Sequence, residues 1–123
     1  MCIRDRSKAE ATAATIKNKL LKAGGIVSTN NPSGQQWDSP NGWAPQQWIV
    51  IKGLHNYDFN ALANDIKGRW LKLNKKIFKK TGKLLEKYNV ENINLGTGGG
   101  EYPVQDGFGW TNGVYLKLAS ENI

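Results

Sequence analysis

Cysteine, histidine and long apolar runs are scarce in this sequence, and each scarcity removes a class of function. The single cysteine, Cys2, and the single histidine, His55, do not make up the ligand cluster of a metal site. One cysteine also allows no disulfide within the chain. No apolar run approaches the roughly 20 residues of a membrane-spanning helix. We therefore expect neither a bound metal nor a membrane-spanning segment.

Two motifs of phosphate-binding and acyl-transfer enzymes are also missing. The glycine-rich stretch 96–100 invites a phosphate-loop interpretation, but it lacks the Gly-Lys-Ser/Thr of that loop, and Glu101 would repel a phosphate. The sequence contains no Gly-x-Ser-x-Gly nucleophile elbow, so serine-hydrolase chemistry has no support. Carboxylates among aromatic and amide side chains remain as the source of chemistry.

The chain is basic, with a net charge of +7, and its lysines gather between Lys67 and Lys87. There they take the polar positions of an amphipathic helix, whereas Trp70 and Phe78 fall on or near its apolar stripe. Proteins that bind single-stranded nucleic acid interleave basic groups with exposed aromatic ones. A solvated helix face explains the lysines better, so we predict no nucleic-acid partner, and the sequence indicates no protein partner.

The apolar period predicts an all-α chain whose helices are joined by long, glycine-rich loops. The expected helices cover about residues 8–23, 44–55, 59–80 and 112–119. Each is preceded by residues that can begin or cap a helix: a capping box of Ser7 and Glu10, Pro45 at a first turn, Asp58, and Thr111 or Asn112. No strand pattern and no internal repeat are visible.

Two loops between these helices combine tryptophan with amides and carboxylates, and they run over 35–45 and 98–113. Such side chains suit sugars, because tryptophan faces pack on the apolar faces of pyranose rings while carboxylates and amides bond vicinal hydroxyls. Among the side chains of these loops are Trp37, Asp38, Trp43, Glu101, Gln105 and Asp106. On composition alone, turn-rich connections whose tryptophans fill the core are the slightly better explanation.

The first loop closely resembles a signature of the trehalase family of glycoside hydrolases, Gln-Trp-Asp-x-Pro-x-Gly-Trp-Ala-Pro at 36–45. The second loop is similar to the same family's C-terminal block, with Glu-Tyr-Pro at 101–103 and Gln-Asp-Gly-Phe-Gly-Trp-Thr-Asn-Gly-Val at 105–114. Its glycine run is about one residue shorter than in many relatives. The resemblance covers about residues 20–119. It implies the C-terminal part of an (α/α)6 barrel and inverting hydrolysis of α,α-trehalose, a small-molecule substrate, to two glucose molecules without a cofactor.

The resemblance also bears on the extent of the chain. Residues 1–6, Met-Cys-Ile-Arg-Asp-Arg, resemble the translation of a sequencing adapter, so we expect them to be non-native. Residues 7–123 would then be the C-terminal portion of a trehalase-like catalytic domain. The family's general-acid aspartate and substrate-clamping arginines belong to upstream motifs that do not occur here. We therefore expect the fragment to be inactive alone and the activity to belong to its full-length parent.

An inverting hydrolase needs a general acid for the leaving oxygen and a general base for water. From the residues alone, Glu101 is the natural choice of base because it lies in a loop beside aromatics, whereas Glu86, flanked by lysines, has the pattern of a surface residue. The resemblance implies the opposite, because the Glu-Lys-Tyr at 86–88 matches the position of the family's general base. Glu101 then binds substrate hydroxyls.

The resemblance gives the other candidates supporting roles. Trp37 and Trp43 would form sugar-contacting walls, and Asp38, Gln105 or Asp106 would support them. We expect Glu86, Glu101 and the 36–43 loop to converge on one end of the structure. Two alternatives stay open: a hydrolase of a related α-glucoside, and a noncatalytic carbohydrate-binding module, which would bind a disaccharide by itself.

Overall fold

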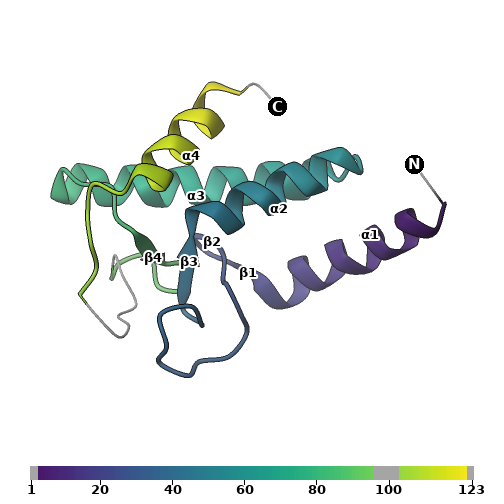
Figure 1. Ribbon diagram of the computed structural model, residues 1–123, viewed down its shortest axis with the longest axis horizontal. Helices are drawn as coiled ribbons and strands as arrows, with labels where there is room; N and C mark the ends of the chain where they lie inside the picture. Colours follow the sequence, from purple (N-terminus) through teal and green to yellow (C-terminus); the bar gives the residue numbers. More distant parts are fainter. Residues whose placement is uncertain (1–2, 96–102, 122–123) are drawn as a thin grey trace.

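The computed structural model describes residues 3–95 and 103–121, in which helices predominate (Figure 1). The helices are α1 (Ile3–Thr15), continued by a π-helical turn η1 (Ile16–Leu20), α2 (Ala44–Asn56), α3 (Asn60–Thr81) and α4 (Gly109–Ser120). Four short strands join them: β1 (Leu21–Lys22), β2 (Gly25–Ile26), β3 (Asn41–Trp43) and β4 (Lys87–Asn89). None of the helices in the described ranges is long and apolar enough to cross a membrane.

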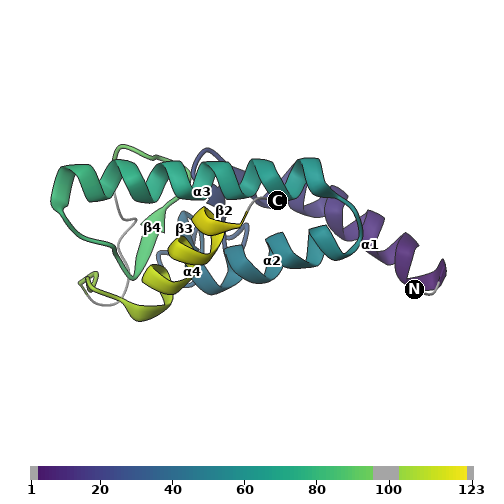
Figure 2. The ribbon, with the colours of Figure 1, turned by 90° about the horizontal axis from the view of Figure 1, so that it is seen from above.

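Helix α3 is the axis on which α2 and α4 pack, and α1 extends away from this body (Figures 1 and 2). The buried side chains of α3 recur at helical spacing, and Ile66 and Trp70 have no exposed surface. Burial of each such side chain contributes about 1.5–3 kcal/mol. The helix ends at Gly82, whose φ of 72° is left-handed and whose N–H donates to Phe78 O at 2.7 Å. The expected helices 44–55 and 59–80 are thus confirmed within a residue or two.

The expected caps of three helices are wrong, and the first helix and α3 are two of them. The first helix begins at Ile3 instead of at Ser7, and its α-helical part ends at Thr15, where the π-helical turn leads into β1. Arg6 joins it to the α2–α3 turn, because its Nη1 donates to Tyr57 O at 2.6 Å. Asp58 has a φ of 64° and does not cap α3, whose N-cap position is held by the next residue without a side-chain bond.

The last helix also begins earlier than expected, at Gly109 instead of at Thr111 or Asn112. The Thr111 hydroxyl is used elsewhere, because it donates to Leu85 O at 2.7 Å. That bond joins the second tryptophan-containing loop to the chain just before β4.

Four strands are present although the sequence predicts none. They form two antiparallel ladders, β1–β2 and β3–β4. The registers are Leu21↔Ile26 and Lys22↔Gly25 in the first ladder, and Asn41↔Asn89, Gly42↔Tyr88 and Trp43↔Lys87 in the second. Strands of two or three residues are too short for an alternating apolar pattern to show in the sequence.

The buried amide of Gln47 holds β2 to α2 at two points. Its Nε2 donates to Ile26 O at 2.7 Å, and Ile26 N–H donates to its Oε1 at 3.0 Å. Gly42 of β3 packs against the same strand so closely that a Cβ would lie 2.6 Å from Val90 Cγ1 and 2.8 Å from Ile26 O. Only glycine fits there, so this residue of the first motif is a packing requirement.

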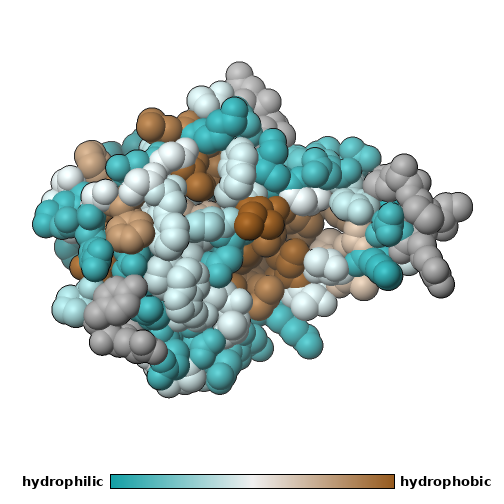
Figure 3. Space-filling model, in the orientation of Figure 1, coloured by the Kyte–Doolittle hydropathy of each residue, from teal (hydrophilic) through white to brown (hydrophobic). Residues whose placement is uncertain are grey.

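Apolar side chains remain at the surface between α1 and α2, where Figure 3 shows a hollowed apolar patch. Ile49 is exposed on its rim, and Val50, Tyr57 and Phe59 line it. The helices of the described chain therefore do not cover all of one another's apolar faces.

Candidate functional site

Both tryptophan-containing loops are anchored to the β3–β4 ladder. Strand β3 continues the first loop and places Trp43 opposite Lys87 of β4. Glu86 immediately precedes β4, and its N–H donates to the backbone oxygen of Gln105 at 2.9 Å. The ladder therefore brings together the first loop, Glu86 and the described part of the second loop.

Glu86 is buried, with an exposed fraction of 4%. Its Oε2 lies 3.9 Å from the ammonium of Lys87, which is fully buried. A carboxylate and an ammonium are seldom buried unless they are paired, because removing each from water is costly. The pattern of a surface ion pair, which the flanking lysines suggested, is thus wrong for Glu86.

Three tryptophans form a cluster beside this ladder, and two of them are stacked. Trp37 lies flat on Trp43, with ring centroids 3.7 Å apart, and Trp110 meets Trp43 edge-on at 5.9 Å. Trp43 is fully buried and donates from Nε1 to Gln36 O at 3.1 Å. Trp37 and Trp110 are the members with exposed surface. Of the two tryptophans expected to contact sugar, Trp37 is therefore accessible, and Trp43 supports it from beneath.

Asp38 organises the first loop. Its Oδ1 accepts a hydrogen bond from Thr29 Oγ1 at 2.7 Å, and its Oδ2 accepts one from the Ser33 hydroxyl. These bonds, the one from Ser33 first, hold the pKa of the Asp38 carboxyl below its usual value. Its backbone oxygen also accepts from Asn41 N–H at 3.0 Å, at the start of β3. Asp38 thus fixes the turn that presents Trp37.

The described part of the second loop has fewer contacts with the candidate site than the first loop has. Gln105 reaches Glu86 through its backbone oxygen, and its side chain is exposed. Asp106 forms an ion pair with Lys83, with Oδ2 and Nζ 2.5 Å apart. Glu101 lies outside the described residues. The structure thus brings Glu86 together with the 36–43 loop, whereas the expected approach of Glu101 to both stays a prediction.

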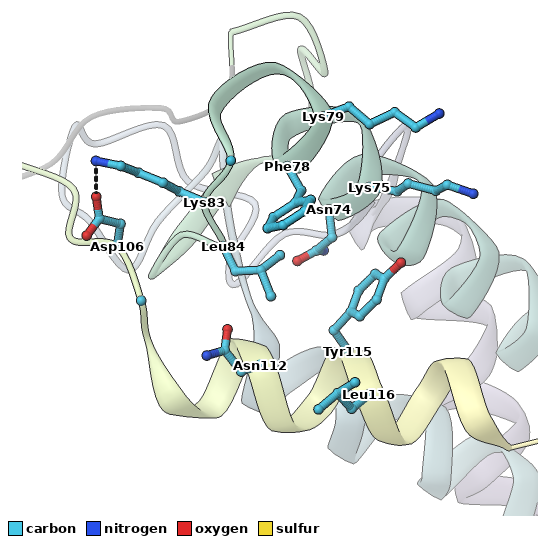
Figure 4. Close-up of a pocket in the computed structure, with 12 residues that line it drawn as sticks. Asn74, Lys75, Phe78, Lys79, Lys83, Leu84, Asp106, Asn112, Tyr115 and Leu116 are labelled. Atoms are coloured by element: carbon cyan, nitrogen blue, oxygen red, sulfur yellow. Dashed lines mark ion pairs between the residues drawn. The ribbon is translucent and has the colours of Figure 1, made fainter.

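Next to the Lys83–Asp106 pair, an apolar groove of about 820 Å³ opens between α3 and α4 (Figure 4). Phe78, Leu84, Tyr115 and Leu116 are among the residues that line it. The amide of Asn74, at its floor, donates to Trp70 O at 2.8 Å, while its buried Oδ1 has no hydrogen-bond partner in the described part of the chain. Within residues 3–95 and 103–121, no group of three or more His, Cys, Asp or Glu could hold a metal ion.

Sequence comparison decides the family. The sequence model of the Trehalase family matches residues 3–122. The chain belongs to the trehalase family. It is 50% identical over 111 residues to the periplasmic trehalase of Pseudomonas aeruginosa, covering 90% of the chain and 20% of that protein. It is 51% identical over 115 residues to the periplasmic trehalase of Escherichia coli, covering 94% of the chain and 20% of that protein.

A solved trehalase shows the same fold. Neutral trehalase Nth1 from Saccharomyces cerevisiae superposes on the chain with a TM-score of 0.74 at 30% identity, covering 93% of the chain and 20% of Nth1. The expected fold class, all-α and part of an α/α barrel, is thus confirmed. The chain spans about 20% of the length of these relatives.

Sequence reasoning missed two residues of this candidate site. Trp110 was not a candidate, although it stands in the Gly-Phe-Gly-Trp of the second motif and its ring meets Trp43. Lys87 was counted with the solvated lysines, because nothing in the sequence separates a buried lysine from its exposed neighbours.

Proposed function

We propose that the chain is the C-terminal part of an inverting α,α-trehalase, whose full-length form hydrolyses trehalose to two glucose molecules. Membership of the trehalase family supports this. The observation that carries it is the position of Glu86, a buried carboxylate held on the same ladder as the tryptophan stack of the first loop. A carboxylate beside an aromatic wall is what a glycoside hydrolase needs at the point where water attacks a sugar.

Glu86 acts in this proposal as the general base. It takes a proton from a water molecule as the oxygen of that water forms a bond to the anomeric carbon of one glucose unit. The bond from this carbon to the bridging oxygen breaks, and a general acid protonates that oxygen. Inverting enzymes hold the two carboxyl groups about 6.5–9.5 Å apart so that water fits between them. The acid must come from outside this chain, whose motifs lack it, so the chain alone is inactive.

The remaining residues bind the disaccharide or shape its site. Trp37 offers the exposed face on which a sugar ring packs, and Trp43 holds that face in place. Asp38 fixes the loop between them. Glu101 bonds substrate hydroxyls, and Gln105 with Asp106 supports the second loop.

A hybrid enzyme tests the proposal. Residues 7–119 of this chain replace the matching segment of the Pseudomonas aeruginosa periplasmic trehalase, so that Glu86 and both loops work with a complete set of upstream groups. We expect hydrolysis of trehalose, with one α- and one β-glucose appearing together in the proton NMR spectrum at early times. A folded hybrid without activity would sink the proposed function, and two α-anomers would sink the inverting mechanism.

The same hybrid distinguishes trehalose from related α-glucosides. We expect kcat/KM for trehalose to exceed that for maltose and for an aryl α-glucoside. An equal or higher value for another α-glucoside would change the assigned substrate and leave the role of Glu86 untouched.

A further inference from the structure

Lys87 is a buried lysine at the junction of the two tryptophan-containing loops. It stands on β4 opposite Trp43 of β3, and its side chain is 0% exposed. Lysine is almost never fully buried unless its charge is compensated, because an ammonium loses its hydration there. The contacts of Lys87 must therefore compensate the loss of hydration of its ammonium.

The ammonium of Lys87 lies close to groups from both chain segments that form the ladder. Nζ lies 3.9 Å from Glu86 Oε2 and donates to Gln36 Oε1 at 3.5 Å. It also lies 5.4 Å from the centroid of the Trp43 ring, within the range of a cation–π interaction. Glu86 belongs to the segment before β4, whereas Gln36 and Trp43 belong to the first loop. One charge thus contacts the candidate base and the loop that carries the aromatic wall.

We propose that Lys87 is a positioning residue for Glu86. Its ammonium fixes the carboxylate and holds the first loop against it. The inference rests on the proposed function, since it concerns the same proton transfer. Because the Lys87 side chain has no exposed surface, it acts on the reaction through Glu86.

The charge matters because the pair is shielded from water. Between buried groups the attraction of an ammonium for a carboxylate is much stronger than at the surface. It therefore restrains the carboxylate oxygens, and a base displaced by about 1 Å can lose about 10²-fold in rate. The contacts of Lys87 with Gln36 and Trp43 also fix the position of the first loop relative to Glu86. A shift of these two residues would move the aromatic wall relative to the base.

The test uses the complete parent enzyme with Lys87→Met, Glu86→Gln and the two changes together. Methionine keeps the unbranched shape and most of the length of the side chain and removes its charge. We expect Lys87→Met to lower kcat by about 10²-fold, the loss typical of a misplaced group, with KM for trehalose changed much less. In the Glu86→Gln background the same change should lower kcat by no more than about twofold, because residues that act as a unit are not additive.

Thermal melting separates positioning from a purely structural role. Lys87→Met removes the ammonium beside the buried Glu86 carboxylate, so it should lower Tm, and adding Glu86→Gln should restore much of the loss. Lys80→Met, on the exposed face of α3, is the matched control and should leave kcat and Tm unchanged.

Three results would overturn the inference: unchanged kcat in Lys87→Met, an equal loss of kcat in both backgrounds, or a double variant no more stable than Lys87→Met. The last comparison still decides if Lys87→Met alone does not fold. An unmodified enzyme that folds but leaves trehalose intact would instead remove the proposed function, while the melting comparison would still test the Lys87–Glu86 coupling.

Discussion

Trp37 lies on Trp43 with an angle of 10° between the ring planes. Trp37 is 44% exposed, whereas Trp43 is fully buried. Because Trp43 is fixed by its bond to Gln36 and by the ladder, the ring stacked on it, Trp37, is held in one orientation. A surface ordered in advance loses less conformational entropy on binding.

Substitutions at these two tryptophans should therefore have different effects. In the complete enzyme, Trp37→Ala should raise KM for trehalose by up to roughly tenfold, as expected for the loss of an aromatic contact of about 0.5–1.5 kcal/mol. Trp43→Ala should lower the free energy of unfolding by about 3–5 kcal/mol, because it empties a buried site. Steady-state kinetics and urea unfolding measure the two effects. A large loss of stability in Trp37→Ala with unchanged KM would contradict the assignment.

Replacement of the proposed base should affect turnover far more than binding. Glu86→Gln keeps the size of the side chain but cannot take a proton from water, so kcat should fall by about 10²–10⁴-fold. Azide, which attacks without a base, should restore part of the rate. Glu101→Gln serves as the comparison: it should weaken binding as well and should not respond to azide. Rescue of the Glu101 variant instead would reverse the two roles.

The Gln47 clamp predicts an effect on stability, because its amide holds β2 to α2. Gln47→Leu leaves the N–H and C=O of Ile26 unpaired in a buried place, at a cost of about 1–3 kcal/mol for each group. Gln46→Leu, at the neighbouring and partly exposed position, is the control and should change stability by less than about 1 kcal/mol. Urea unfolding compares them. Equal stability of the two variants would show that the amide clamp contributes nothing.

Tyr88 should make stability depend on alkaline pH. Burial raises the pKa of its phenol from 10.0 to about 12, although the bond from Leu85 N–H works in the opposite direction. The folded state thus favours the protonated phenol, whose contribution is complete below about pH 10 and is lost as the pH rises toward about 12. The difference in Tm between the unmodified enzyme and Tyr88→Phe should shrink over this range. Tyr115→Phe is the control, and a pH-independent difference at Tyr88 would contradict the prediction.

The isolated chain should behave as an incomplete domain. Phe78 and Leu116 at the α3–α4 groove and Ile49 on α2 are exposed, so the purified chain should bind a hydrophobic dye and melt without a sharp transition. Isothermal titration should detect little binding of trehalose. A cooperative melting transition together with disaccharide binding would instead favour an independent carbohydrate-binding module.

The helices could be predicted where residues close together in the sequence determine where a helix begins and ends. Pro45 and Gly82 mark the beginning of α2 and the end of α3, and the apolar period between them is regular. The expected cap at Asp58 was wrong because this residue lies in a tight turn and has a left-handed φ. A capping residue instead has an extended backbone. The strands were missed because each depends on a partner distant in the sequence.

The site was harder to predict for the same reason. Composition favoured Glu101 over Glu86, and the resemblance to trehalases alone reversed that choice. The burial of Glu86 and Lys87 follows from the pairing of β4 with β3, which no local pattern shows. Trp110 was overlooked because its contact with Trp43 joins two loops.

The β3–β4 ladder also limits how such a protein can be re-engineered. Side chains alternate between the faces of a strand, so a slip of one residue would turn Lys87 away from Trp43 and carry Glu86 with it. Insertions and deletions are therefore tolerable only outside the paired residues. Exchange of either loop between trehalases must carry both strands as one cassette.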